Sequence, residues 1–143
     1  MVSLAGQPGD EPLRSAADIV LELPSGDGLA ATYGRMQLDG QLSRVQQEMA
    51  ALFSAAERHL EAGSVEEAQE LAIEAVEKTR ADGGGFGEAD SFRLVIQCFT
   101  YQEKHTFALV MAEEELGAFQ KAGNILGQAK MLLSMAEVSL ARR

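Results

Sequence analysis

The chain has 143 residues, 46% of them hydrophobic, which is enough for one domain with a buried core. Its formal charge of −10 argues against nucleic acids and anionic membrane surfaces as partners, because binding to phosphate needs clustered Lys and Arg. Cys98 is the single cysteine and cannot form an internal disulfide, and neither a signal-peptide pattern nor an apolar run of about 18 residues is present. We therefore expect a soluble, acidic protein of a reducing intracellular compartment, either the cytoplasm or an organelle interior.

Residues 1–40 differ in composition from the rest of the chain. They contain all three prolines and show no helical periodicity. Asp18–Leu23 reads DIVLEL, and it is separated by the turn-forming PSGDG from a second mixed stretch over Leu29–Leu38. A hairpin of two strands and a short helix opened by Ser15 are both compatible with this pattern. We predict a largely irregular N-terminal arm and leave open whether it packs on the helices.

The first predicted hairpin covers residues 41–81. Apolar residues of Val45–Leu60 follow spacings of three and four, which predicts an amphipathic helix of roughly twenty residues. Gly63 ends this helix, and Ser64 with Glu67 three positions later has the pattern of a capping box for the next one. The tight turn between them predicts an antiparallel pair.

Helical periodicity resumes after a glycine-rich linker. Two further apolar stripes, divided just before residue 104, predict a second hairpin over residues 88–122. A last stripe predicts a terminal helix over residues 125–142. This last helix has no predicted hairpin partner.

The helical segments share a register of 40 residues. Leu52, Phe92 and Leu132 are separated by this offset (92 − 52 = 40 and 132 − 92 = 40), and the neighbouring triplets are also apolar. The linkers follow the same register, with GGGFGEA at Gly83–Ala89 and GNILGQA at Gly123–Ala129. We interpret the linker glycines as helix-ending and turn residues. A repeat of this length is typical of stacked helical hairpins.

This pattern resembles the tetratricopeptide repeat (TPR) in its longer variety of about forty residues. The residues at the family's characteristic small positions are Ala56, Ala68 and Ala75, while Gly63 stands in its turn and Val65 at its usual aromatic position. The segment from residue 122 to 142 is similar to a linker and the first helix of a third repeat. The resemblance covers residues 45–143 and implies an all-α superhelix of antiparallel hairpins with about two and a half repeats.

The sequence departs from the family pattern at several positions. Leu52, Phe92 and Leu132 stand in place of the usual Trp, and Glu115 stands where Ala75 would recur. An unrelated helical bundle is the alternative interpretation.

The resemblance also implies a concave groove, lined by the first helix of each hairpin, in which a peptide docks. The candidate groove residues are Phe53, Glu57, Leu60, Arg93, Gln97, Tyr101, Lys130, Leu133 and Glu137. Arg93 and Lys130 are expected to be neighbours that hold a partner's carboxylate, beside apolar anchors. The alternative is that the two cations only balance Glu57 and Glu137.

The family's clamp for chaperone C-termini needs Lys and Asn at set groove positions. This sequence has Glu57, Gln97 and Glu137 at the second of these positions in the three helices. A partner protein or peptide with basic and apolar side chains therefore fits better than one with a terminal carboxylate.

Residues for catalysis or metal binding are sparse. His59 and His105 stand alone, and no Cys or His pair has the spacing of a zinc site. Gly83–Glu88 reads GGGFGE, but it follows no predicted strand and precedes no Lys, so it does not fit a phosphate loop. We expect no cofactor, no metal and no enzymatic activity.

Two functions are consistent with these observations. The first is a scaffold or adaptor that binds a partner segment in its groove. The second is a structural subunit of a larger complex, attached through the N-terminal arm and the unpaired last helix, which includes association into an oligomer through that helix.

Overall fold

The computed structural model of the protein describes residues 40, 42–85 and 87–143, and these residues form five helices and no strand. The helices are α3 (Arg44–Glu61), α4 (Val65–Ala81), α5 (Glu88–Tyr101), α6 (His105–Ala122) and α7 (Ile125–Ala141). The all-α prediction is confirmed. The predictions for the N-terminal arm lie outside the described residues, except at residue 40.

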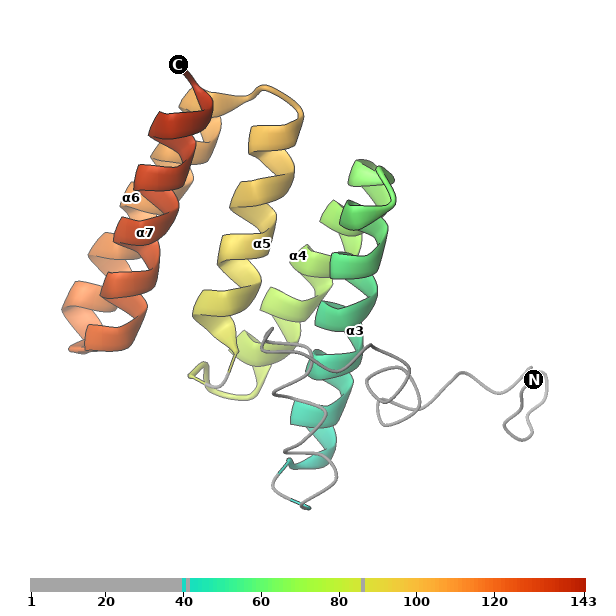
Figure 1. Cartoon of the computed structure of the whole chain (residues 1–143). Helices are drawn as coiled ribbons and strands as arrows, with labels where there is room; N and C mark the ends of the chain where they lie inside the picture. Colours follow the sequence, from blue (N-terminus) through green and yellow to red (C-terminus); the bar gives the residue numbers. More distant parts are fainter. Residues whose placement is uncertain (1–39, 41, 86) are drawn as a thin grey trace.

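Consecutive helices form antiparallel pairs, and the two helices of each pair lie in different layers (Figure 1). We call α3, α5 and α7 the front layer; α4 and α6 lie behind them. Each helix packs against the next one in the chain, and α5 also packs against both α3 and α7. The helix α5 is therefore the central element, in contact with all four others.

The helices α3, α4, α5 and α6 end in the same kind of left-handed turn. In each turn the first residue with a positive φ has a value between 62° and 94°, and the amide of the following residue donates to a carbonyl in the last helical turn. These residues are Gly63, Gly83, Glu103 and Gly123. Glu103 is the only one of these four with a side chain, so it adopts at some cost a conformation that glycine adopts freely.

The capping box is at the start of α3 and not, as predicted, at the start of α4. Ser64 makes no side-chain capping bond, because its backbone belongs to the tight turn and has a ψ of 70°. Ser43 instead has an extended backbone, and its Oγ accepts from the Gln46 amide at 3.2 Å. The Gln46 side chain accepts from the Ser43 amide at 2.8 Å, which completes the reciprocal pair.

Small residues allow the two layers to approach closely. Ala68 and Ala72 on α4 and Ala108 and Ala112 on α6 are fully buried. Larger side chains at these four positions would push the helix axes apart.

Gly127 has a different role from the turn that we predicted. It lies in the first turn of α7, without a positive φ, and faces Phe119 of α6. A Cβ atom at this position would be 2.5 Å from Cδ1 of the Phe119 ring. Gly127 therefore lets α6 and α7 come together, whereas Gly123, with a φ of 70°, ends α6 as predicted.

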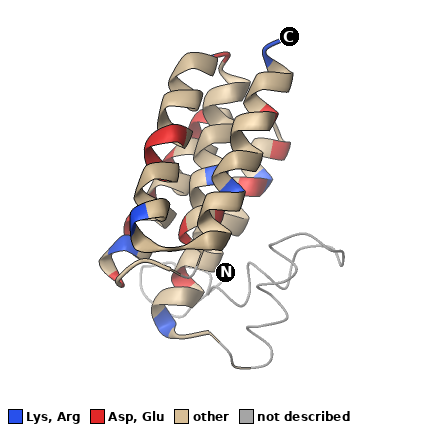
Figure 2. Cartoon of the chain, turned by 90° about the vertical axis from the view of Figure 1, so that its left-hand side faces the viewer, with Lys and Arg blue, Asp and Glu red and all other residues tan. Residues whose placement is uncertain are grey.

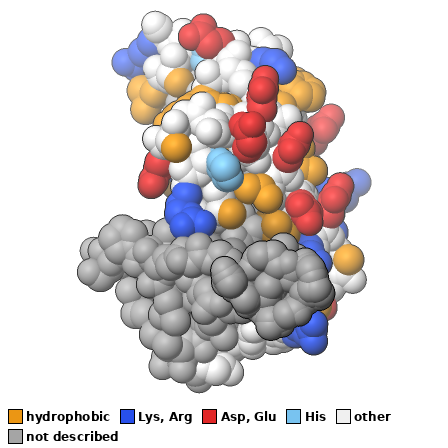
Figure 3. Space-filling model, turned by 90° about the vertical axis from the view of Figure 1, so that its right-hand side faces the viewer, with side chains coloured by type: hydrophobic (Ala, Val, Ile, Leu, Met, Phe, Trp, Pro, Cys, Tyr) orange, Lys and Arg blue, Asp and Glu red, His pale blue; other side chains and the backbone are white. Residues whose placement is uncertain are grey.

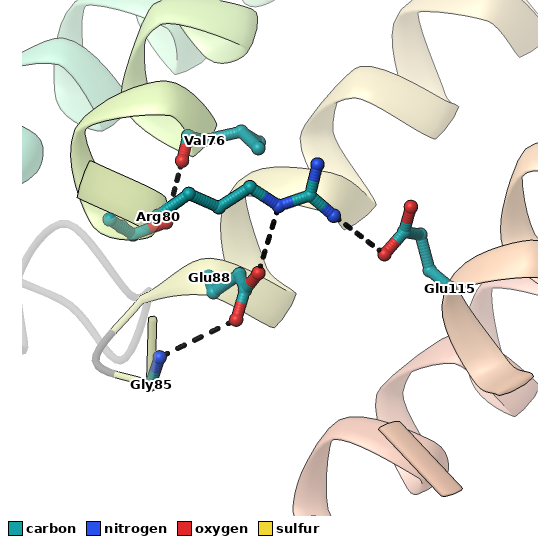
Figure 4. A network of polar contacts seen from close by, with 6 residues as sticks. Val76, Arg80, Gly85, Glu88 and Glu115 are labelled. Carbon is teal, nitrogen blue, oxygen red and sulfur yellow. Dashed lines mark hydrogen bonds and ion pairs between the residues drawn. The ribbon is translucent and has the colours of Figure 1, made fainter. Parts of the chain in front are cut away.

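Arg80 at the end of α4 links three helices (Figure 4). Its Nε donates to Oε2 of Glu88 on α5 at 3.1 Å, and its Nη2 donates to Oε1 of Glu115 on α6 at 2.9 Å. The guanidinium also lies 4.6 Å from the ring centroid of Phe92, a cation–π contact. Glu115 departs from the alanine of the repeat pattern, and the structure gives it a partner in the preceding hairpin.

The outward side of α4 is acidic. Its five glutamates are all exposed, as the helical periodicity indicated: Glu66, Glu67, Glu70, Glu74 and Glu77. The α3–α4 end of the molecule accordingly presents acidic side chains to solvent (Figure 3).

Candidate functional site

The predicted groove residues come from the three helices of the front layer. Tyr101 at the end of α5 is 63% exposed, and Leu133 on α7 is 51% exposed. Gln97 on α5 and Glu137 on α7 are partly exposed. These four residues are therefore available on the surface of α5 and α7.

Phe53 and Leu60 are not surface residues, contrary to our prediction. Phe53 is 2% exposed and Leu60 is 9% exposed. Both share the buried stripe of α3 with Met49 and Ala56, at the helical spacings of three and four. They pack in the core and cannot act as exposed anchors for a partner.

The two groove cations are paired within the protein. Arg93 on α5 donates through Nη2 to Oε2 of Glu137 at 3.2 Å and through Nη1 to Oγ of Ser134 at 3.1 Å. Lys130 on α7 donates to Oδ1 of Asp90 on α5 at 2.5 Å. Both cations thus connect α5 to α7. The pairing of Arg93 with Glu137 agrees with our alternative interpretation, in which Glu57 and Glu137 balance the two cations. The partner of Lys130, however, is Asp90 and not Glu57.

Glu57 on α3 is a half-buried carboxyl group. Burial, together with the nearby negative charges of Glu61 and Asp90, raises its pKa to about 7. No side chain in the described part of the chain donates a hydrogen bond to Glu57. The front layer therefore contains an acidic group whose charge is not compensated.

A shallow cavity of about 180 Å³ opens between α5 and α7, and Gln97, Tyr101 and Glu137 are among its lining residues. Pockets for small molecules usually have volumes of roughly 300–1,000 Å³, so this cavity fits a single side chain better than a metabolite. A larger cavity of about 350 Å³ between α3 and α4 is lined mainly by charged residues, including Glu48 and Lys78. Such a lining is unlike the mostly apolar one of small-molecule sites.

The described residues contain no group of three or more His, Cys, Asp or Glu side chains that could hold a metal ion. Cys98 is fully buried in α5, and burial raises the pKa of its thiol to about 11. The thiol is therefore protonated at neutral pH and has low reactivity.

Asp90 and Ser134 were missed as members of this face. The signal for Asp90 was present in the sequence, because Asp90 and Lys130 are related by the 40-residue register (130 − 90 = 40). The side chains of these two residues meet between α5 and α7. No comparable signal identified Ser134, which is reached by Arg93 through space.

No helix in the described part of the chain is both long enough and apolar enough to span a membrane. Comparisons with protein-family models, with curated proteins and with solved structures found no match.

Proposed function

We propose that the chain is a TPR-like helical repeat module that binds a partner protein and performs no catalysis. The positions of the helices support the repeat: α3, α5 and α7 end at Glu61, Tyr101 and Ala141, which are 40 residues apart (101 − 61 = 40 and 141 − 101 = 40). Proteins built in this way use one layer of helices as an extended binding surface.

The proposed ligand is a polypeptide segment with basic and apolar side chains, bound across the front layer. Glu57 carries this proposal, because a Lys or Arg of the partner would compensate its half-buried charge. The cavity beside Tyr101 would take an adjacent apolar side chain. Arg93 and Lys130 are already paired, so a carboxylate of the partner has no free cation there.

Selection of peptides from a random display library on the immobilised protein tests this proposal. We expect the selected peptides to be basic and apolar, and Glu57→Gln and Tyr101→Ala each to weaken their binding by about tenfold, or 1.4 kcal/mol. Binding should strengthen as the pH rises through 7, since Glu57 then becomes ionised, and Glu57→Gln should remove this pH dependence.

Ile73→Ala provides the control, because Ile73 is a partly exposed apolar residue on α4 in the rear layer. It should leave binding unchanged. Selection of acidic peptides, or equal binding by the wild type and the Glu57→Gln variant, would contradict the proposed ligand.

A structural subunit of a larger assembly is the second candidate function. The large apolar side chains exposed along α7 favour it, because a helix in contact with water normally has one polar face.

A further inference from the structure

The helix α7 has two apolar faces. Gly127, Met131, Ser134 and Val138 form the face that is buried against the rest of the protein. On the opposite side lies a row of exposed residues that we call the outer stripe: Leu126, Ala129, Leu133, Ala136 and Leu140. Leu126 and Leu140 are 64% and 60% exposed, and Ile125 and Leu132 beside the stripe are also exposed. A helix in contact with water on one side normally has polar residues on that side.

The positions of α5 that are equivalent to Ala129, Leu132 and Ala136 are buried, whereas Arg93 and Thr100, which precede Leu133 and Leu140 by 40 residues, are partly exposed. Ala89, Phe92 and Ile96 precede Ala129, Leu132 and Ala136 by 40 residues, and their exposed fractions are 9%, 5% and 1%. On α5 these residues are covered because helices pack on both sides of it. The helix α7 packs only against α5 and α6 among the described elements, so its corresponding side is open.

The outer stripe is also uncharged. Between Ile125 and Ala141 the charged residues are Lys130 and Glu137, and both make ion pairs with α5. Figure 2 views the molecule from the side on which α6 and α7 lie in Figure 1, and most of the ribbon there carries no charge. The opposite end of the molecule, at α4, carries exposed glutamates (Figure 3) and needs no cover.

The stripe is complementary to itself. Its residues are spaced by three, four, three and four positions, and leucine alternates with alanine. Two such helices that run antiparallel about a two-fold axis can place Leu133 and Leu140 of each copy opposite an alanine of the other, while Leu126 lies at the end of the overlap. In one register Leu133 faces Ala136 of the second copy and Leu140 faces Ala129. A parallel pair would place leucine against leucine and alanine against alanine, and would leave gaps at the alanine layers.

We propose that a second copy of this chain covers α7, with the outer stripes of the two copies packed antiparallel across a two-fold axis. This inference rests on the second candidate function, a structural subunit of a larger assembly, and identifies the other subunit as a second copy of the chain. A pair of helices of 17 residues each buries less than the roughly 800 Å² per partner of a standard interface. The dimer is therefore in equilibrium with the monomer. Since both copies carry a charge of −10, added salt favours the dimer by screening their repulsion.

Sedimentation analysis of the full chain over a dilution series tests the proposal. We expect the mass to rise from that of one chain towards twice that value with concentration, and to rise further with salt. Ala136→Glu and Leu140→Glu should shift the midpoint of dimerisation at least tenfold to higher concentration, and the milder Leu140→Gln should shift it in the same direction. Ile73→Glu, an equivalent change on α4, should not shift it. Circular dichroism verifies that each variant is folded.

Disulfide cross-linking tests the orientation. In the antiparallel pair, Leu133 lies near its own counterpart in the second copy, whereas Leu126 lies far from its counterpart, towards the other end of α7. We expect Leu133→Cys to form a cross-linked dimer and Leu126→Cys to form none. Cross-linking of Leu126→Cys as fast as that of Leu133→Cys would overturn the antiparallel arrangement.

A chain that stays monomeric at every concentration would overturn the proposal, as would a dimer that is unaffected by the α7 variants. Neither result would contradict peptide binding at Glu57 and Tyr101, which has its own readout, because Leu133 is the one groove residue that belongs to the outer stripe. Salt separates the two interactions further, because it strengthens dimerisation between acidic chains and weakens the binding of a basic peptide.

Discussion

The contact between Gly127 and Phe119 shows how closely a single residue controls the packing of two helices. The Phe119 ring is buried against the backbone of α7, where the absence of a side chain leaves room for it. Gly117, in the middle of α6, has no atom within 4 Å of the position of a Cβ. Two helical glycines ten residues apart (127 − 117 = 10) therefore have different physical roles.

We predict that Gly127→Ala destabilises the protein by about 1–3 kcal/mol, since the added methyl group must displace the Phe119 ring or separate α6 from α7. Urea unfolding followed by circular dichroism measures the change.

Gly117→Ala is the matched control. It should stabilise the protein by about 0.5–1 kcal/mol, because alanine loses less conformational entropy than glycine in a helix. Equal effects of the two substitutions would show that the close approach of Gly127 to Phe119 is not important for stability.

At the scale of elements, Arg80 joins the first hairpin to the second through ion pairs. It belongs to the first hairpin, and both of its carboxylate partners belong to the second. Its side chain is 50% exposed, and that of Glu115 is 16% exposed, so solvent weakens the interaction only in part.

A double-mutant cycle with Arg80→Ala and Glu115→Ala measures this link. We predict a coupling energy of about 0.5–1 kcal/mol in the free energy of unfolding, near the upper end for ion pairs in contact with solvent.

The pair of Arg44 and Glu48 within α3 is the comparison, because its side chains are 92% and 42% exposed at a distance of 3.7 Å. Its coupling should be smaller, about 0.3 kcal/mol. A larger coupling for Arg44 and Glu48 than for Arg80 and Glu115 would be inconsistent with this role of Arg80.

Local sequence patterns located the helices well but not all of their ends. The spacing of apolar residues and the turn conformations of Gly63 and Gly123 depend on residues that are close in the sequence. The helices and these two helix ends were therefore predictable. We predicted the capping box at Ser64 and not at Ser43, because the residue pattern alone does not contain the ψ angle that orients the serine side chain. Gly127 was misinterpreted for a related reason, since its neighbour Phe119 lies on another helix.

At the scale of the whole molecule, α5 is the central helix and packs against α3, α4, α6 and α7. Nine of its residues are buried, and Cys98 among them is fully enclosed. Access to this thiol therefore requires the helices around α5 to separate.

We predict that Cys98 in the native protein reacts with a thiol reagent at least about a thousandfold more slowly than in the unfolded chain, if labelling requires global unfolding. The raised pKa of the thiol slows the reaction further at neutral pH. Spectrophotometric labelling, with and without denaturant, measures the ratio.

A Glu113→Cys variant supplies an exposed thiol on α6 as an internal standard. It should show one fast and one slow site. Rapid labelling of both sites in the folded protein would mean that α5 opens locally, without loss of the whole fold.

The sequence by itself determined the all-α class, the hairpin order and the 40-residue register, because helical periodicity and turn residues act over short distances along the chain. Only the tertiary structure decided which residues of the front layer are accessible. Phe53 and Leu60 became core residues, Arg93 and Lys130 became links between α5 and α7, and Glu57 was left without compensation. Burial and charge pairing depend on side chains from other helices, and the apolar outer stripe of α7 became apparent as an open surface only once its neighbours were in place.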